Sequence, residues 1–387
     1  MMTMTRTEES TAVATPVAPT TLLLAFELGE RSWKLGFTTG LGQQPRIRQI
    51  SARATDRVEE EIARAKARFR LPADAPVLSC YEAGREGFWL HRWLGAHGVS
   101  NHVIESSSIE VNRRARRAKT DRLDLGGLLN VLARHHQGDG RVWRMVRVPS
   151  VAEEDARQLH RTRETVQQDR NRLINRLKGL LTTQGLKLPV DATFPTQLET
   201  AQLWDGTPIP AGLKARLQRG WAQLEFLTRA LTELDAERDA LTADPQTAMG
   251  RYVEALPTLR GIGPIGTWTL ATEIFGWRDI KNRRELAGLV GLVPAPYQSG
   301  ESHHDQGITR AGNKHVRRLM VQLAWSWVRY QPDSALTKWY EGKFGHGSRR
   351  LRRIGIVALA RKLLIALWHY VEHGEVPDGA IVKGQAA

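Results

Sequence analysis

Leucine residues recur every seven positions in the middle of this 387-residue chain, and this repeat limits the possible fold more than any other feature. Heptad spacing predicts long helices that pair along an apolar seam. One line contains Leu159, Val166, Leu173 and Leu180, and the other contains Leu217, Leu224 and Leu231 interleaved with Leu227, Leu234 and Leu241. Four prolines between Gly185 and Gly212 predict the turn of an antiparallel coiled coil. A hairpin within one chain and a seam between two chains both fit, and we favour the hairpin.

The residues before this repeat alternate between strand-like and helical patterns. They predict a hairpin over 21–39, helices over 56–70 and 88–94, and strands over 77–81 and 102–104. Glu27 directly follows the apolar residues of the first strand, and Glu82 follows a later one. Because strands of an α/β sheet can end at one edge, we expect these carboxylates to converge there.

A dense basic run leads directly into two more carboxylates, Asp121 and Asp124. On a helix their spacing puts both on one face, with roughly 5–6 Å between the Cβ atoms. Cations attract phosphates, and aspartates supply the oxygen ligands that Mg²⁺ prefers, so the stretch suggests phosphodiester chemistry. A solvated, salt-bridged helix face fits the same stretch about equally well. The run consists of Arg113, Arg114, Arg116, Arg117 and Lys119.

The charge balance points to a polyanionic partner. The chain has 56 Lys and Arg against 41 Asp and Glu, a net charge of +15. Nucleic acid is the leading candidate and an anionic membrane is the competitor, yet no apolar run approaches the ~20 residues that span a bilayer. The acids near the start of the chain do not fit a secretory signal, so we expect none there. The single cysteine, Cys80, excludes an intrachain disulfide framework and predicts a cytoplasmic protein in which it is buried.

The last third contains a glycine turn before an expected helix. Arg260, Gly261 and Gly263 lie in this turn, where backbone N–H groups can face a phosphate as in a helix-hairpin-helix element. A plain helix cap is the alternative reading.

Further along the chain, Ser299 lies between Gln298 and Gly300 in a stretch of turn residues that predicts a loop. The cations that follow are Arg310, Lys314, Arg317 and Arg318. Such a loop can expose a hydroxyl near bound phosphate, although a Ser-Gly turn without chemistry also fits. His303 and His304 lack a cysteine or a third histidine at ligand spacing, so we expect no zinc site there.

Six motifs, in this order, resemble the DEDD transposases of bacterial insertion sequences over about residues 21–370. They are Phe26-Glu27-Leu28-Gly29, Tyr81-Glu82-Ala83-Gly84, Lys119-Thr120-Asp121-Arg122-Leu123-Asp124, the leucine repeat, Leu259-Arg260-Gly261-Ile262-Gly263-Pro264, and Gly291-Leu292-Val293-Pro294 running to Tyr297-Gln298-Ser299-Gly300. The specificity lies in their order, because each motif alone is weak.

The resemblance implies an α/β RNase H-like (RuvC-like) domain at 21–148, as in Holliday-junction resolvases. It further implies an α-helical coiled-coil arm at 149–250 and a mainly α-helical C-terminal transposase domain at 251–375, which carries the helix-hairpin-helix-like element. Composition predicts a disordered tail at 1–20, and we expect a flexible tail at 376–387.

The resemblance also assigns residues and partners. Glu82, Asp121 and Asp124 match three of the four acids that hold Mg²⁺. The family usually has Asp at the fourth position, where this chain has Glu27, whose extra methylene moves the carboxylate outward by about 1.5 Å. Ser299 matches the nucleophile, and Ser302 is a weaker substitute. The implied partners are double-stranded donor and target DNA, a structured guide RNA encoded by the element, and further copies in a dimer or tetramer.

We therefore expect a transposase or recombinase that cuts and rejoins DNA through a Mg²⁺-assisted serine. The acids and the serine lie in different domains, and the resemblance suggests a site assembled across subunits. Two alternatives remain open. One is a metal-dependent resolvase of the Holliday-junction type with water as nucleophile, and the other is a catalytically inactive nucleic-acid-binding copy, which Glu27 would explain.

Overall fold

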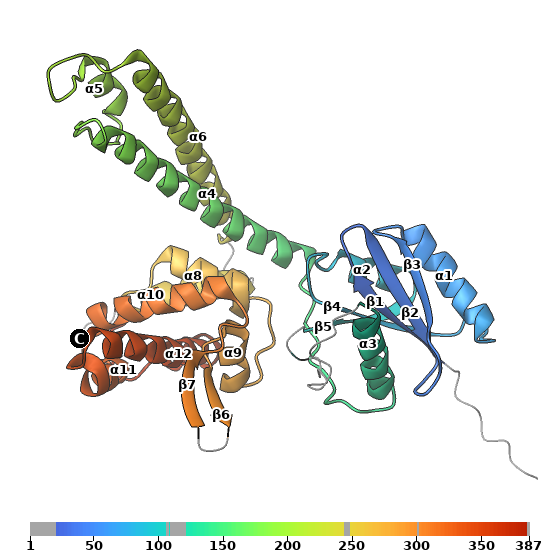
Figure 1. Ribbon diagram of the computed structural model, residues 1–387. Helices are drawn as coiled ribbons and strands as arrows, with labels where there is room; N and C mark the ends of the chain where they lie inside the picture. The colour runs from blue at the N-terminus through green and yellow to red at the C-terminus, as the bar shows by residue number, and fades with distance from the viewer. Residues whose placement is uncertain (1–20, 106–107, 109–120, 244–247, 300–301, 385–387) are drawn as a thin grey trace, which may run out of the picture. The chain divides into compact units, whose positions relative to one another are not determined.

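The computed structural model describes residues 21–105, 108, 121–243, 248–299 and 302–384. The chain forms two compact units, which meet in the sequence between Val148 and Pro149 (Figure 1). The first unit is built on a sheet, and the second consists mainly of helices.

The first unit contains a five-stranded mixed sheet in the order β3-β2-β1-β4-β5. The central strand β1 pairs antiparallel with β2 and parallel with β4, while β2–β3 is antiparallel and β4–β5 is parallel. The strand bounds are β1 Leu22–Leu28, β2 Ser32–Thr38, β3 Arg46–Ser51, β4 Val77–Glu82 and β5 Val99–Ile104. The expected α/β class and the β1–β2 hairpin are confirmed.

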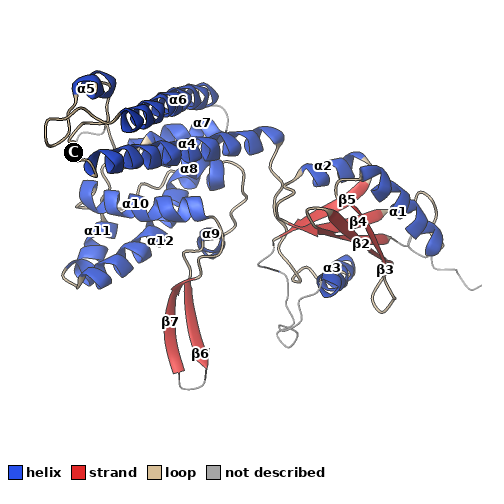
Figure 2. Cartoon of the chain, turned by 45° about the horizontal axis from the view of Figure 1, so that its top comes forward, coloured by secondary structure: helices blue, strands red, loops and turns tan. Residues whose placement is uncertain are grey.

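Helices cover both faces of this sheet, because alternate residues of a strand point to opposite sides (Figure 2). Leu22, Leu24 and Phe26 of β1 belong to an apolar cluster with α1 (Thr55–Arg68) and α2 (Trp89–Ala96). Leu23 and Ala25 pack instead with α3 (Asp121–His136), next to Cys80. Cys80 is fully buried as expected, and burial raises the pKa of its thiol above the ordinary range.

The sequence did not reveal strand β3. Its only apolar residues, Ile47 and Ile50, are three positions apart and so do not show a strand's alternation, and it lies at the edge of the sheet, where little apolar burial is needed. Arg46 is nonetheless buried, and its guanidinium pairs with the carboxylate of Glu61 on α1. A charge pair thus replaces the apolar contact that a hydrophobic pattern would have signalled.

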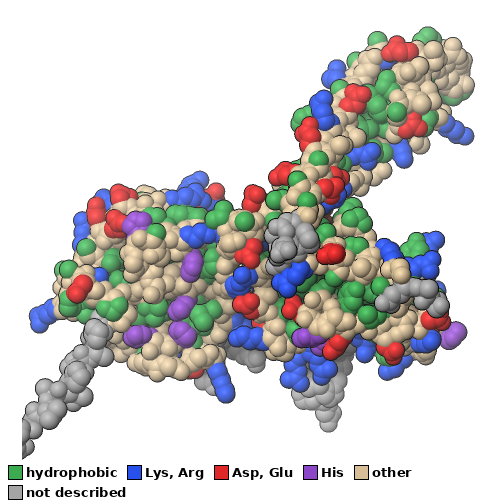
Figure 3. All heavy atoms as spheres, turned by 180° about the vertical axis from the view of Figure 1, so that it is seen from behind, with side chains coloured by type: hydrophobic (Ala, Val, Ile, Leu, Met, Phe, Trp, Pro, Cys, Tyr) green, Lys and Arg blue, Asp and Glu red, His purple; other side chains and the backbone are tan. Residues whose placement is uncertain are grey.

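The second unit begins with an antiparallel helical hairpin, which we call the arm. Helix α4 (Val151–Thr182) packs against α6 (Ala211–Leu241), and α5 (Phe194–Thr200) lies near the turn. Side-chain hydrogen bonds join Arg163 to Asp235 at 2.7 Å and Arg176 to Gln223 at 3.2 Å. Later residues of α4 thus contact earlier residues of α6, so the two helices are antiparallel. Acidic and basic side chains are interspersed along the arm (Figure 3). The leucine seam therefore lies within one chain, as we favoured.

The predicted heptad lines are only partly kept in the arm. Leu217, Leu224 and Leu231 are buried, but Leu241 is 44% exposed. On α4 the buried residues near the turn are Leu173, Leu177 and Leu181 rather than the predicted Leu180. The spacing of four follows an ordinary helix, so the hairpin is not a regular coiled coil throughout.

The rest of this unit is a helical bundle with one β-ribbon. Its helices are α7 Ala248–Ala255, α8 Pro264–Leu270, α9 Arg283–Val290, α10 Lys314–Tyr330, α11 Ala335–Tyr340 and α12 Arg349–His373, with short helical turns η3 Leu256–Thr258, η4 Ala271–Phe275 and η5 Glu341–Gly345. The ribbon pairs β6 (Pro294–Ser299) with β7 (Ser302–Ile308) in antiparallel fashion.

Helix α12 is the one described helix that is long and apolar enough to cross a membrane by length and composition. Ile356, Leu359, Leu363 and Leu367 of this helix are instead buried in the core of the bundle, beside residues of α8, α9 and α10. The helix therefore has the role of a core helix in this unit.

The segment after α12 differs from the expected flexible tail. Its residues 377–383 pack on the bundle: Val382 forms a β-bridge with Leu259, and the side chain of Gln331 bonds to both backbone groups of Ile381. These bonds satisfy backbone groups that a free tail would leave to water, and they attach the segment to the turn before α8.

Candidate functional site

Two acids lie side by side at the ends of parallel strands. Phe26 of β1 is in register with Tyr81 of β4, so the next residues, Glu27 and Glu82, are neighbours. Both lie on the face that packs with α3, because Ala25 and Cys80, two residues earlier, are buried there. Glu82 is exposed and Glu27 is partly buried. Glu27 and Glu82 come together because β1 and β4 are parallel, so their carboxyl ends lie at the same edge of the sheet.

Helix α3 brings a third segment to the same edge. Leu125 and Leu129 press on Gly36, where an added Cβ would lie 2.7 Å from Leu129 Cδ1. Gly36 is opposite Ala25, and the later residues of α3 line a shallow pocket with Thr38, opposite the start of β1. The helix therefore runs against β1, and its first turn points toward the end that carries Glu27.

The levels of these residues can be compared from the backbone alone. Asp121 precedes Leu125 by one turn, about 6 Å of helix rise. Glu27 follows Ala25 by two residues, about 6.6 Å of strand. The first turn of α3, with Asp121 and Asp124, is therefore at the end of the helix nearer to Glu27. The side chains of the two aspartates lie outside the described part of the chain.

Glu30 is the other acid near the end of β1. It lies in the turn to β2, is exposed, and pairs with Arg85 at 3.2 Å. Glu30 therefore does not belong to the Glu27–Glu82 pair, because it lies beyond the end of β1 and has Arg85 as its partner. The basic run at Arg113, Arg114, Arg116, Arg117 and Lys119 lies outside the described residues.

Ser299 belongs to the second unit. The sequence predicted a loop, but Ser299 is the last residue of β6, in register with Ser302 of β7. Two prolines in β6 conceal the strand in the sequence, because proline cannot donate to a sheet ladder and is tolerated only at edges such as this two-stranded ribbon. Both serines therefore lie at the tip of a β-ribbon.

The glycine turn before α8 has one packed side and one open side. Gly261 has a φ of +92°, and its carbonyl accepts a hydrogen bond of 2.7 Å from Ser326 Oγ. A side chain there would also meet Tyr330, so only glycine fits. Arg260 and Gly263 are exposed, and Gly263 precedes the first turn of α8. The open side could therefore face a phosphate.

The four cations predicted after Ser299 divide into two pairs. Arg310 and Lys314 are exposed. Arg317 donates to the carbonyl of Val290 at 2.9 Å, at the end of α9, and Arg318 pairs with Glu164 of α4. Arg317 and Arg318 thus have contacts within the protein that the sequence could not reveal.

A basic cavity of about 1140 Å³ was missed by the sequence analysis. It lies between α9, the base of the ribbon and α12, and Trp339 and Ile354 give it apolar walls. Its cations are Arg283, Arg284, Arg310, Arg349, Arg350, Arg353, Arg361 and Lys362, and no carboxylate lines it among the described residues. Lys362 lies 4.7 Å from the ring of Trp339. Only the arginine pairs at 349–350 and 352–353 could have signalled the cavity.

This combination suits a nucleic acid. Guanidinium groups bind phosphates, and apolar or aromatic walls accept bases or sugars. The cavity is formed by segments between residues 283 and 365, so its charge density depends on the fold of the bundle.

Comparison with known proteins identifies the family. The model of the family described as "Transposase IS116/IS110/IS902 family" matches residues 253–340. The protein named "Putative transposase y4rJ" from Sinorhizobium fredii is 37% identical over 95% of this chain and 98% of its own length. The transposase for insertion sequence element IS1328 of Yersinia enterocolitica is 28% identical over 56% of this chain and 63% of its own. For that of IS1111A of Coxiella burnetii the identity is 23%, over 74% of each chain. This chain belongs to the IS116/IS110/IS902 family of transposases.

Proposed function

We propose that this transposase cuts and rejoins DNA with Ser299 as nucleophile, with Mg²⁺ held by Glu27, Glu82, Asp121 and Asp124, and with a structured RNA from its own element as guide. The observation that carries the proposal is the in-register pair Glu27 and Glu82 beside the first turn of α3. We extend the proposal to an RNase H-like (RuvC-like) fold for the first unit.

The acids fit the proposed metal by their chemistry. Mg²⁺ prefers oxygen ligands and is often held by a few carboxylates together with substrate phosphate. Glu27 reaches farther than the usual Asp, and its position in the strand next to Glu82 supports its use as the fourth acid. When bound, the metal would polarise the scissile phosphate and neutralise charge on the leaving oxygen.

The chain's own residues carry out the transfer in this mechanism. The Oγ of Ser299 attacks phosphorus, and the bond from phosphorus to the leaving DNA oxygen breaks. The hydroxyl proton passes to the leaving oxygen. The resulting protein–DNA ester conserves the bond for rejoining to a second DNA end. Because the acids and Ser299 belong to different units, the reaction requires both units, from one chain or from two copies of a dimer or tetramer.

Binding of DNA and guide RNA would use the basic cavity, which includes Arg310, together with the exposed cations Arg260 and Lys314. Eight cations without a carboxylate among the described lining residues favour a polyanion over a small neutral ligand. The run from Arg113 to Lys119 adds charge next to the proposed metal acids in the sequence.

Trapping of the ester tests the nucleophile. The full chain is incubated with Mg²⁺, the candidate guide RNA and a target duplex nicked just past the cleavage site, so that the departing strand diffuses away. We expect a denaturation-resistant protein–DNA band that Ser299→Ala abolishes. Ser302→Ala is the matched control, since it changes the serine opposite in the ribbon, and it should keep the band. Cleavage that persists in Ser299→Ala would point to water as nucleophile, as in a resolvase.

A second variant tests the metal acids. Asp121→Asn should abolish cleavage because it removes a carboxylate ligand, while binding of DNA and RNA stays within a few-fold of the unmodified chain. Band-shift titrations at fixed salt would measure that binding. Equal loss of cleavage and binding would make Asp121 a structural residue. If no condition gives cleavage by the unmodified protein, Glu27→Asp is the restoring change to test.

A further inference from the structure

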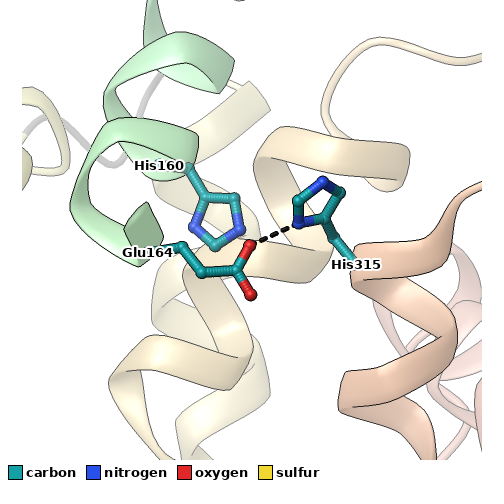
Figure 4. A group of neighbouring side chains, drawn as sticks. All are labelled: His160, Glu164 and His315. Carbon is teal, nitrogen blue, oxygen red and sulfur yellow. Dashed lines mark hydrogen bonds and ion pairs between the residues drawn. The ribbon is translucent and has the colours of Figure 1, made fainter. Parts of the chain in front are cut away.

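Two histidines and a glutamate meet where the arm joins the helical bundle (Figure 4). His160 and Glu164 lie one turn apart on α4, and His315 lies in the first turn of α10. One ligand atom from each residue falls within 4.8 Å of the others. All three residues belong to the second unit, and none takes part in the proposed DNA chemistry.

His160 has a buried ring nitrogen without a hydrogen-bond partner among the described residues of the protein. The side chain is 5% exposed, and the buried nitrogen is Nε2. Buried polar atoms are nearly always paired, and an ion is one partner that would satisfy this nitrogen. The ring lies beside the carboxylate of Glu164 in Figure 4.

Glu164 and His315 are held in place from several sides. Nδ1 of His315 bonds to Oε2 of Glu164, and Arg318 pairs with the other carboxylate oxygen, Oε1. The backbone N–H of His315 donates to Oδ1 of Asn313 at 2.9 Å. Arg318 and Asn313 thus orient these two residues from outside the cluster, as hydrogen-bonding neighbours orient the ligands of protein metal sites.

The supporting network extends to a buried carboxylate. Asn313 Nδ2 donates to Glu273 at 2.6 Å, and Arg161 donates to both oxygens of Glu273 at 2.8 and 3.0 Å. Arg161 therefore has Glu273 as its acidic partner, and Arg318 has Glu164. Glu273 thus balances the charge of Arg161, while the single charge of Glu164 would be shared between Arg318 and a bound ion.

We propose that His160, Glu164 and His315 bind a zinc ion that joins the base of the arm to α10. Two imidazoles and one carboxylate form a donor set that zinc uses, with a fourth position open to water. Imidazole nitrogens favour Zn²⁺ over Mg²⁺, which prefers oxygen. When zinc binds, His315 gives up its hydrogen bond to Glu164, the two side chains move apart to the spacing of zinc ligands, and the buried His160 nitrogen gains a partner. Arg318 keeps the carboxylate oriented from its other oxygen.

The site has the three protein ligands and open position of catalytic zinc sites, but its position between two helices also gives the ion a structural effect. Helix α4 is part of the arm. Helix α10 is the next element after the β-ribbon, whose strand β6 ends at Ser299. A metal bridge between the two helices would stiffen this joint and fix the direction in which the arm leaves the bundle. This role is independent of the proposed Mg²⁺ site in the first unit.

Zinc binding to the full chain tests the proposal, with Asp121→Asn as background so that the proposed Mg²⁺ acids do not compete. After treatment with a chelator, we expect one Zn²⁺ per chain by calorimetry and metal analysis. The thermal midpoint of the second unit should rise and saturate at one equivalent. Cobalt in place of zinc should give visible absorption from nitrogen ligands. The proposal would be overturned if the chain showed no saturable zinc binding. It would also be overturned if binding were unchanged after substitution of His160, Glu164 or His315.

Variants separate a metal site from a plain ion pair. His160→Gln and His315→Gln should each abolish stoichiometric binding and the cobalt spectrum, and Arg318→Met should weaken binding about 10–100-fold. His136→Gln, which changes an exposed histidine at the end of α3, should bind as before. Circular dichroism checks the fold of each variant. If one histidine variant fails to fold, zinc binding is measured instead with Glu164→Gln and with the other histidine variant. Normal zinc binding by both of these variants would refute the site.

Discussion

Glu273 is the buried charge on which the joint between arm and bundle depends. It is 1% exposed and lies in the π-helical turn η4, which directs it toward Arg161 of α4 and Asn313 before α10. Burial alone would raise the pKa of Glu273, but hydrogen bonds and charge from Arg161 lower it below the ordinary 4.5. The pairing of Glu273 with Arg161 therefore stabilises the fold at pH values above the ordinary pKa of 4.5. This contribution is lost as the pH falls through the lowered pKa of the folded state.

Glu273→Gln should therefore destabilise the second unit by about 3 kcal/mol at pH 7, because it leaves Arg161 without its partner charge. Urea denaturation followed by tryptophan fluorescence would measure the change. The difference from the unmodified chain should shrink well below pH 4.5, where Glu273 itself becomes protonated. Glu254→Gln, an exposed change of the same kind, should have little effect at either pH. A constant difference down to low pH would contradict the charge argument.

The sequence could reveal residues whose role follows from local position. Glu27 and Glu82 each follow an apolar strand, and parallel pairing then brings them together. His160 and His315 gave no such signal, because 155 positions separate them along the chain and only the packing of α4 on the bundle unites them. Whether the four acids bind metal and Ser299 attacks DNA stays a prediction.

At the scale of elements, hydrophobic periodicity identified the long helices but only part of their buried face. Leu224 and Leu241 both fit the heptads, yet Leu224 is 4% exposed and Leu241 is 44% exposed. The strands β3 and β6 escaped because charges and prolines interrupt their patterns, while pairing with a neighbour supplies their backbone hydrogen bonds. Periodicity reports burial by apolar contact and is silent where burial uses charge or strand pairing.

The two leucines give a direct test of the seam. Leu224→Ala should cost about 2–5 kcal/mol in arm stability, since it removes a buried side chain from the hairpin. Leu241→Ala should change stability by less than about 0.5 kcal/mol, because its side chain already contacts water. Thermal unfolding followed by circular dichroism at 222 nm would separate the two variants. Equal losses would mean that the exposed leucine is covered in solution, by a second copy for example.

At the scale of the whole molecule, net charge predicted a polyanion but not where it binds. The excess of cations is spread over both units, and the arm has acids and bases interspersed. The bundle collects eight cations around one cavity only after α9, the ribbon and α12 have packed. Salt dependence is the property that distinguishes such a site from scattered surface charge, because each phosphate contact releases counterions.

Replacing Arg350, Arg353 and Arg361 by Ala should therefore weaken DNA and RNA binding and flatten the slope of log K against log salt by about 2 to 3, near 0.9 for each lost duplex phosphate contact. The matched control replaces Arg216, Arg219 and Arg229, three exposed cations of α6, which removes the same net charge outside the cavity. Fluorescence anisotropy from 50 to 300 mM salt would give both slopes. If the arm variant flattened the slope as much as the cavity variant, binding would follow net charge alone, and the cavity would have no special part in it.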